Sequence, residues 1–469
     1  MSTPAEPSSP GDAARWFAPG LAAITLIALI GRFAYLIRSK VDNTLTIYQG
    51  DAFWYSTVAQ NLAKGKLFLN PFTGNPTADH PPLTVVILAP ASFLFRNSGY
   101  AQRVTMVLLG AATVVVIGLA ARHLAGPKAG LIAATIAAGA PALWVNDVLI
   151  MSETLTALLV AMVLWAGIAL AERQTIRLAL LAGVVCGLAA LTRAETGLFL
   201  PLMVWPILAR ARNLDWRRRW QLLVIATAGT AAVMAPWAVL NLTRFQEPVA
   251  ISNNDGLTLL GANCTTTYNG RLMGGWVIEP CITDLYASID GKKPALTDAQ
   301  RAAQRAAGRA NTPTALCDDP NQKRLPCWDS SKVSKLMRSE GLRYITGHTR
   351  DLPRVVLARN GRVWGFYRFD QAVGTGAFEG RTPWVSRWGF YLTWVLLPAS
   401  AAGAYVLHRR KVSLAPFIAS LLIVVSVTTA FYGLVRFRLP YDVASSLLAG
   451  VAISALLDHR QKYKSPEPS

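Results

Sequence analysis

The sequence is poor in charge for its length, and this deficit excludes most classes of soluble protein. Only 15% of the 469 residues are charged, whereas a soluble protein carries about 25%. Hydrophobic residues make up 52%, so the composition indicates a membrane protein. Acidic residues number 26 against 46 basic ones, which gives a net charge of +20. Because the basic residues cluster between apolar runs, this charge follows the positive-inside rule, and we expect no nucleic-acid partner.

No cleavable signal peptide is evident, and no solenoid-type repeat is visible. Residues Met1–Asp12 are small, polar and rich in Pro and Ser, which predicts a disordered tail. Apolar runs of about 17 to 25 residues can cross a bilayer as helices, and we expect an all-α, polytopic membrane protein with about ten of them. The predicted spans are 16–37, 101–122, 128–145, 153–171, 176–192, 196–209, 219–240, 386–407, 413–434 and 440–457.

Short basic loops predict which side of the membrane is cytoplasmic. Five of them fall on one side if all ten runs cross, so that side should face the cytoplasm. Their basic residues are Arg122, Lys128, Arg173, Arg177, Arg210, Arg212, Arg217, Arg218, Arg219, Arg409, Arg410, Lys411, Arg460, Lys462 and Lys464. Arg38 and Lys40 disagree, since they follow the first span on the outer side. The apolar run 83–95 is too short to cross, so we expect a re-entrant or interfacial helix on the outer face.

This topology divides the chain into five parts, two of which contain the outward-facing segments. The parts are a cytoplasmic tail 1–15, a transmembrane catalytic core 16–240 with a first outer loop 38–100, an extracytoplasmic segment 241–385, C-terminal transmembrane helices 386–457 and a cytoplasmic tail 458–469. Basic residues interleaved with apolar ones between 332 and 368 could form a solvated helical face or an amphipathic belt that contacts membrane lipids.

Cysteine is also scarce, with five residues in the chain. Cys186 falls within a predicted span and should be inert packing. The other four, Cys264, Cys281, Cys317 and Cys327, lie in the second outer segment, where an oxidising environment allows up to two disulfides and three connectivities. We favour pairing of neighbours, Cys264 with Cys281 and Cys317 with Cys327. A metal site is the weaker alternative, because no CxxC or His pair accompanies them.

Asp51 is the first candidate for catalysis. It lies about ten residues past the first span, and Tyr55, Val58, Ala59 and Leu62 follow it with the spacing of one helix face. This pattern predicts that Asp51 begins an interfacial helix at the outer surface. The carboxylate could simply cap that helix. Alternatively, a partly desolvated carboxylate could act as a general base on an attacking hydroxyl.

Asp79 and His80 precede two prolines and the short apolar run. Prolines fit the start of a helix, so the two side chains could cap it, contact a phosphate or an acceptor, or bind a metal ion. No further His is near in sequence, which weakens the metal alternative.

Other polar residues lie at the outer ends of predicted spans. Asp147 and Glu153, with Asn146 and Ser152 beside them, follow one span. Ionisable groups at membrane depth mark functional sites. Alternatively, these residues could lie at the membrane edge and simply be solvated. These residues and the arginines at other outer turns belong to one site only if the outer ends of their spans lie close together in the fold.

Arginines complete this set of candidates. Arg193 could pair with Glu195 or bind a phosphate, to which its fork of donors is suited. Arg436 and Arg438 lie at another outer turn, on the side opposite the basic loops, which favours anion binding. One cavity would then hold carboxylates for an acceptor hydroxyl and cations for a leaving phosphate.

Several motifs resemble those of the GT-C membrane glycosyltransferases. The closest branch is the one that contains protein O-mannosyltransferases and lipid A aminoarabinose transferases, and the resemblance covers about 45–455. The motifs are Asp51-x3-Tyr55-x3-Ala59-x2-Leu62-x2-Gly65, His80-Pro81-Pro82-Leu83, Ser152-Glu153-Thr154-Leu155, Leu191-Thr192-Arg193-Ala194-Glu195, Ala235-Pro236-Trp237 with Asn241, Asn253-x2-Gly256-x4-Gly261-x-Asn263, and Arg436-Phe437-Arg438-Leu439-Pro440.

The resemblance implies inverting transfer of a sugar from a polyprenyl-phosphate donor to a hydroxyl of a glycan, lipid or protein, on the outer side of the bacterial cytoplasmic membrane. It implies that Asp51 is the base and adds Tyr55 to the substrate-binding residues. Family members often have an Asp-Glu pair where this chain has Asp51-Ala52, so a second carboxylate would come from Asp79, Asp147 or Glu153. Some members bind a divalent metal near the position of Asp79 and others need none, so a metal stays an open alternative.

Two functions of other classes compete with this hypothesis. A transporter or flippase of lipid-linked sugars would be expected to show inverted repeats and broken central helices, which the sequence lacks. A non-catalytic scaffold of the cell envelope would leave Asp51 dispensable. The ionisable residues crowd the outer ends of spans, apart from Arg32, and this favours chemistry at the membrane surface.

Overall fold

The computed structural model of the chain describes residues 10–38, 50–71, 74–283, 285 and 329–464. These residues form helices, and the β-structure among them is a single bridge between Leu69 and Pro76. Six of the described helices are long and apolar enough to cross a membrane. They are α1 (Pro10–Arg38), α4 (Gly99–Ala125), α7 (Ser152–Glu172), α10 (Trp216–Arg244), α19 (Pro383–Arg409) and α21 (Leu439–Lys464).

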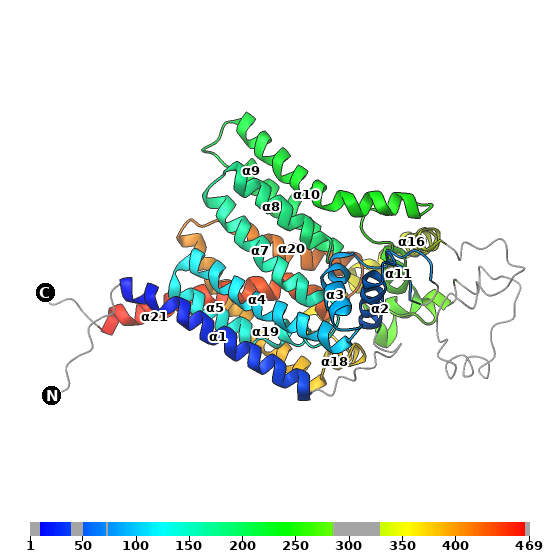
Figure 1. The fold of residues 1–469 in the computed structure, drawn as a ribbon, viewed down its shortest axis with the longest axis horizontal. Helices are drawn as coiled ribbons and strands as arrows, with labels where there is room; N and C mark the ends of the chain where they lie inside the picture. The colour runs from blue at the N-terminus through cyan, green and yellow to red at the C-terminus, as the bar shows by residue number, and fades with distance from the viewer. Residues whose placement is uncertain (1–9, 39–49, 72–73, 284, 286–328, 465–469) are drawn as a thin grey trace, which may run out of the picture.

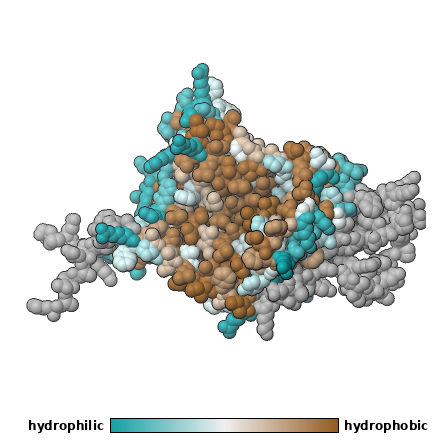
Figure 2. Space-filling model, in the orientation of Figure 1, coloured by the Kyte–Doolittle hydropathy of each residue, from teal (hydrophilic) through white to brown (hydrophobic). Residues whose placement is uncertain are grey.

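Shorter helices complete the bundle, and the chain is an all-α, multi-pass membrane protein. They are α3 (Leu83–Leu94), α5 (Pro127–Gly139), α6 (Pro141–Trp144), α8 (Ile176–Ala190), η2 (Ala194–Leu198), η3 (Leu200–Val204), α9 (Trp205–Ala209) and α20 (Ala415–Ala430). Hydrophobic residues cover the middle of the bundle surface, with hydrophilic ones toward its ends (Figure 2), as a bilayer requires.

Two of the ten predicted spans are not single regular helices. The predicted span 128–145 is interrupted at Ala140, whose ψ of 111° separates α5 from α6. The cause is Pro141, because a proline disfavours helical conformation in the residue before it. The predicted span 196–209 is a composite of 3-10, π and α turns. Pro201 and Pro206 lie within it, and a proline cannot donate the backbone hydrogen bond of a regular helix.

The remaining helices gather at one end of the bundle. They are α2 (Asp51–Ala63), α11 (Asp255–Ala262), α12 (Thr265–Tyr268), η4 (Gly270–Leu272), α16 (Ser330–Gly347), η5 (Thr349–Asp351), α17 (Leu352–Trp364), α18 (Phe369–Phe378) and η6 (Val435–Arg438). Figure 1 shows α2 and α3 running across this end, beside α11 and α16, while α1 begins and α21 ends at the opposite end. We call the first of these the site end and the second the basic end.

Contacts place the basic loops together at the basic end. Lys128 at the start of α5 pairs with Asp458 near the end of α21 at 2.9 Å. His123 of α4 lies 2.8 Å from Glu172 at the end of α7, and Arg122 stacks over the ring of Phe17 in α1. The basic loop at 122–128, the end of α7 and the end of α21 therefore share one side of the bundle.

Glycines allow two pairs of helices to approach closely. A Cβ at Gly183 of α8 would lie 2.0 Å from the carbonyl oxygen of Ala226 in α10. A Cβ at Gly403 of α19 would lie 2.0 Å from the carbonyl oxygen of Leu448 in α21. Small residues at such crossings bring helix backbones together in membranes, where packing rather than water drives association. These contacts support the rigid bundle on which the site end is built.

Candidate functional site

The site is organised around Asp51, the first residue of α2. Gly50 before it has a φ of 52°, a left-handed conformation that glycine adopts without strain. The carboxylate does not cap the helix. Instead its Oδ2 accepts a hydrogen bond from Arg436 Nη1 at 2.6 Å, and its Oδ1 lies 3.5 Å from His80 Nε2. The side chain keeps 29% exposure, so Asp51 is held by two partners and still open to a ligand.

Aromatic residues of α2 hold His80 beside Asp51. The imidazole contacts the ring of Trp54 at 4.8 Å and the ring of Tyr55 at 4.9 Å between centroids. The following prolines lead into α3, where the N–H of Leu83 donates to the carbonyl oxygen of Leu191 at 2.9 Å. The loop that carries His80 is therefore fixed to α2 and to the end of α8.

Arg193 and Glu153 are fixed by one another and by a further carboxylate. Glu153, at the start of α7, is 1% exposed, and its Oε1 lies 3.1 Å from Arg193 Nη1. Arg193 Nε donates to Glu195 Oε1 at 2.7 Å. The sequence left open whether Arg193 pairs with Glu195 or faces a cavity, and in the structure it does both, because it also lines the larger cavity described below.

Two residues that sequence reasoning missed extend this network. Arg381 lies 3.8 Å from Glu153 and pairs with Glu379, which in turn lies 3.3 Å from Arg436 Nη1. Both come just before the span that begins near residue 386. The signal that could have found them is the one used for Arg436, namely charged residues at the outer end of a span.

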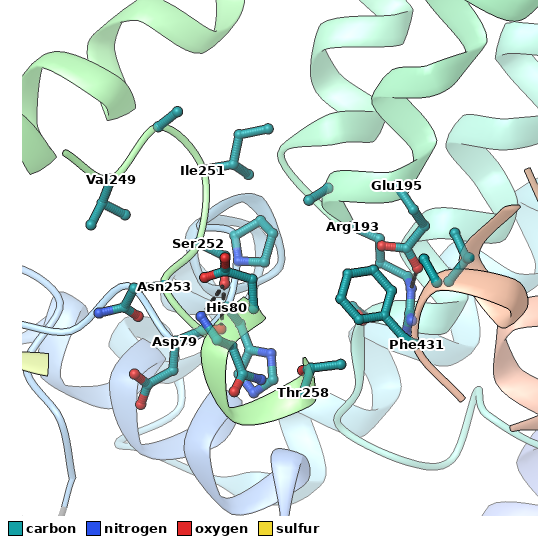
Figure 3. A pocket seen from close by; sticks show the side chains of 18 of the residues that line it. Asp79, His80, Arg193, Glu195, Val249, Ile251, Ser252, Asn253, Thr258 and Phe431 are labelled. Carbon is teal, nitrogen blue, oxygen red and sulfur yellow. Dashed lines mark hydrogen bonds and ion pairs between the residues drawn. The ribbon is translucent and has the colours of Figure 1, made fainter. Parts of the chain in front are cut away.

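Two cavities flank the Asp51–Arg436 pair. The larger has a volume of about 910 Å³ and the smaller about 790 Å³. Both are lined by Asp51, Asn254, Thr258, Tyr432 and Arg436, which thus form the wall between them. In the larger cavity, Asp79 and His80 lie on one side and Arg193 and Glu195 on the other, with the loop of Val249–Asn253 alongside (Figure 3).

The two cavities differ in the elements that line them. The larger runs along the membrane helix α20, where it meets Ser426, Val427 and Ala430, and along Leu198 and Phe431. The smaller is lined by segments at the site end, including α11, α17, α18 and the stretch 272–279. The larger cavity is thus lined in part by the apolar helix α20, and the smaller is not.

Burial and charge act in opposite directions on Asp51. Burial raises the pKa of its carboxyl, but the charge of Arg436 and the contact with His80 outweigh this and hold the pKa well below its usual value. Asp51 is therefore ionised at neutral pH. Burial raises the pKa of Asp79, whose Oδ2 accepts a hydrogen bond from Asn70 at 3.2 Å.

Two predicted site residues lie outside both cavities. Asp147 is fully buried and pairs with Arg32 of α1 at 2.6 Å. Arg438 is also fully buried and donates to Asp442 at 2.9 Å and to the carbonyl oxygen of Val363 at 3.0 Å. Neither Asp147 nor Arg438 lines either large cavity, so the structure does not bring these two predicted residues together with the others.

The basic stretch between 332 and 368 divides into two kinds of residue. Lys335 and Arg338 of α16 line the larger cavity and pair with Glu247 at 2.8 Å and Asp255 at 2.6 Å. Arg359 and Arg362 of α17 are buried and donate mainly to backbone carbonyl oxygens. The stretch is therefore partly a structural support and not wholly a solvated face.

The structure contains the Cys264–Cys281 disulfide that the sequence predicts. Cys317 and Cys327 lie outside the described residues, and Cys186 is a buried free thiol in α8. The described part of the chain has no group of three or more His, Cys, Asp or Glu side chains placed to hold a metal ion. Asp51, Asp79 and His80 are therefore not part of such a group among these residues.

Comparisons with known proteins agree with this architecture. Residues 79–239, about a third of the chain, match the sequence profile of the dolichyl-phosphate-mannose-protein mannosyltransferase family. No curated protein matches the sequence. Among solved structures, the apo oligosaccharyltransferase of Archaeoglobus fulgidus is similar over 97% of this chain and 52% of its own, at 15% identity and a TM-score of 0.54.

The same similarity extends to a second structure from that organism. Oligosaccharyltransferase AglB of Archaeoglobus fulgidus, in complex with an inhibitory peptide and a dolichol-phosphate, is similar at 14% identity and a TM-score of 0.51, again over 97% and 52% of the two chains. Our chain has the GT-C fold. It spans about half the length of these oligosaccharyltransferases. ArnT of Cupriavidus metallidurans, bound to undecaprenyl phosphate, matches at 16% identity over 97% of this chain and 81% of its own, with a TM-score of 0.42.

Proposed function

We propose that this GT-C protein is an inverting glycosyltransferase that moves a sugar from a polyprenyl-phosphate donor to a hydroxyl acceptor. The observation that carries the proposal is the position of the Asp51–Arg436 pair in the wall between two cavities. A transferase must bring two substrates to one point, with a base for the acceptor and a cation for the leaving group. Asp51 and Arg436 supply both at that point.

The larger cavity is suited to the donor. A polyprenyl chain needs an apolar path in contact with the membrane, and this cavity follows Val427 and Ala430 of α20. Its charged end contains Arg193 and Arg436, and guanidinium groups bind phosphate through paired donors. The oligosaccharyltransferase with the same fold is described in complex with a dolichol-phosphate, which is the same class of lipid.

The smaller cavity is suited to the acceptor. Its lining comes from segments at the site end, and Trp276 offers a ring against which an acceptor could pack. An acceptor hydroxyl that enters there reaches Asp51 from the side opposite the donor. The Asp51 carboxylate takes the hydroxyl proton while the oxygen attacks the anomeric carbon. Attack opposite the leaving phosphate in one displacement inverts that carbon.

The orientation in the membrane belongs to the same proposal. The basic loops lie at the end of the bundle opposite Asp51, and such loops face the cytoplasm. The site would therefore face outward from the cytoplasmic membrane. Trp384 and Trp388 at the start of α19 are exposed, as expected for aromatic residues at a membrane interface.

Replacement of the base tests the proposal. Asp51→Asn keeps the shape of the side chain, and loss of a general base typically costs 10²–10⁴-fold in rate. We therefore expect Asp51→Asn to insert into the membrane normally but to fail to restore the envelope glycans of a deletion strain, as measured by mass spectrometry. Asp458→Asn, which removes a carboxylate at the basic end, serves as the control and should restore them. Full restoration by Asp51→Asn would remove Asp51 from the mechanism and favour a transporter or scaffold.

A further inference from the structure

Arg436 has more acidic neighbours than one guanidinium can neutralise. Its Nη1 lies 2.6 Å from Asp51 Oδ2, 3.3 Å from Glu379 Oε1 and 3.8 Å from Glu153 Oε1. The shortest of these contacts is with the residue that we assign as the base. A carboxylate bound so closely to a cation is a poor proton acceptor, because the cation favours the ionised form. The base is thus restrained in this structure.

Two nitrogens of the same guanidinium, Nε and Nη2, are available to donate hydrogen bonds to a ligand. Its buried Nε has no hydrogen-bond partner, and its Nη2 makes only a 3.4 Å contact with the hydroxyl of Tyr432. A buried N–H without an acceptor is costly, so an oxygen atom of a ligand would satisfy it. Two adjacent N–H groups of a guanidinium match two oxygens of a phosphate. Because Arg436 lines both cavities, such a phosphate can reach it without displacing α2.

The charges of the reaction give Arg436 a reason to contact first Asp51 and then the leaving phosphate. In a polyprenyl phosphodiester the phosphate carries one negative charge. When the bond between the anomeric carbon and the phosphate oxygen breaks, its electron pair goes to that oxygen, and the phosphate gains a second charge. The proton of the acceptor hydroxyl goes to Asp51, which loses its charge in the same step. The total charge of the site is unchanged, but one negative charge has moved from Asp51 to the phosphate.

We propose that Arg436 is shared between Asp51 and the leaving phosphate, and that it moves from the first to the second as the sugar is transferred. This inference rests on the proposed function. Protonation of Asp51 removes the nearest negative charge from Arg436 just when the phosphate needs a cation, so the two events assist each other. Glu379 and Glu153 keep the guanidinium near the wall between the cavities throughout.

Binding of a product analogue tests the inference without any transfer. Farnesyl phosphate is a short polyprenyl phosphate, and Asp51→Asn imitates protonated Asp51. We expect the full-length Asp51→Asn protein in detergent to bind farnesyl phosphate about tenfold more tightly than the wild type, within the usual range of coupling between two sites. The gain should vanish when Arg436→Gln is added, so the double variant should bind no better than Arg436→Gln alone. Asp458→Asn, which removes a remote charge, should bind like the wild type.

Each outcome distinguishes the inference from the proposed function. If neither the wild type nor any variant binds farnesyl phosphate, the proposed function fails and the inference falls with it. If the wild type binds and Asp51→Asn binds no better, the sharing of Arg436 is overturned while the proposed function stands. An equal gain on the Arg436→Gln background would also overturn it, because the gain would then be a general effect of charge.

A second measurement covers the case in which Arg436→Gln does not fold. The methyl diester of farnesyl phosphate carries one charge, as the donor does, whereas the monoester can carry two. Asp51→Asn should therefore increase the preference for the monoester over the diester, relative to the wild type. An unchanged preference would contradict the inference.

Discussion

Glu153 allows the electrostatic account of the site to be tested through stability. Its carboxylate is 1% exposed, lies 3.1 Å from Arg193, and lies 3.8 Å from both Arg381 and Arg436. Removing one partner of a buried ion pair typically costs 3–5 kcal/mol, because the other charge stays buried. Glu153→Gln keeps the shape of the side chain and one hydrogen-bond acceptor for Arg193. We therefore expect a loss of stability at the lower end of this range, about 3 kcal/mol.

The assay is thermal unfolding of the purified protein in detergent. For a chain of this length, a loss of 1 kcal/mol in the free energy of unfolding lowers the unfolding midpoint by roughly 1–2 °C. Glu153→Gln should therefore lower the midpoint by about 5 °C. Glu195→Gln is the matched control, because among the described residues its carboxylate forms an ion pair with Arg193 only, and it is 21% exposed. A partly exposed pair is screened by water and contributes less than a buried one, so the midpoint of Glu195→Gln should fall by less than that of Glu153→Gln.

A double variant separates charge from general damage. Arg381 Nη2 has no hydrogen-bond partner and lies 3.8 Å from Glu153 Oε1, so Glu153→Gln removes a negative charge beside that nitrogen. Arg381→Gln should therefore cost less in the Glu153→Gln protein than in the wild type, by more than about 0.5 kcal/mol. Equal midpoints for Glu153→Gln and Glu195→Gln, or strict additivity of the double variant, would refute the role assigned to Glu153.

Two further predictions concern other parts of the structure. Burial raises the pKa of Asp79, so the stability that its proton contributes is present below about pH 4 and is lost as the pH rises. The unfolding midpoint of Asp79→Asn should therefore rise relative to that of the wild type as the pH increases. A constant difference between the two midpoints would contradict this. Gly110→Ala should destabilise the protein, since its Cβ would lie 1.9 Å from Asp147 Oδ2, whereas Gly139→Ala meets nothing within 4 Å and should not lower the midpoint.

The sequence determined the features that depend on local composition. Runs of apolar residues are sufficient to predict membrane helices, because a bilayer admits few other structures. The start of α2 at Asp51 followed from the helical spacing after it, and the Cys264–Cys281 disulfide from nearness in sequence. These inferences use neighbours along the chain, and the structure contains all of these elements.

Tertiary structure alone decided which charged groups meet. Arg436 and Arg438 are two residues apart in one turn, yet one faces the cavities and the other is buried against Asp442. Asp147 looked like a site residue but pairs with Arg32, which is 115 positions away. The physical reason is that the strength of an ion pair depends on distance and burial, and both are set by how helices pack rather than by the order of residues.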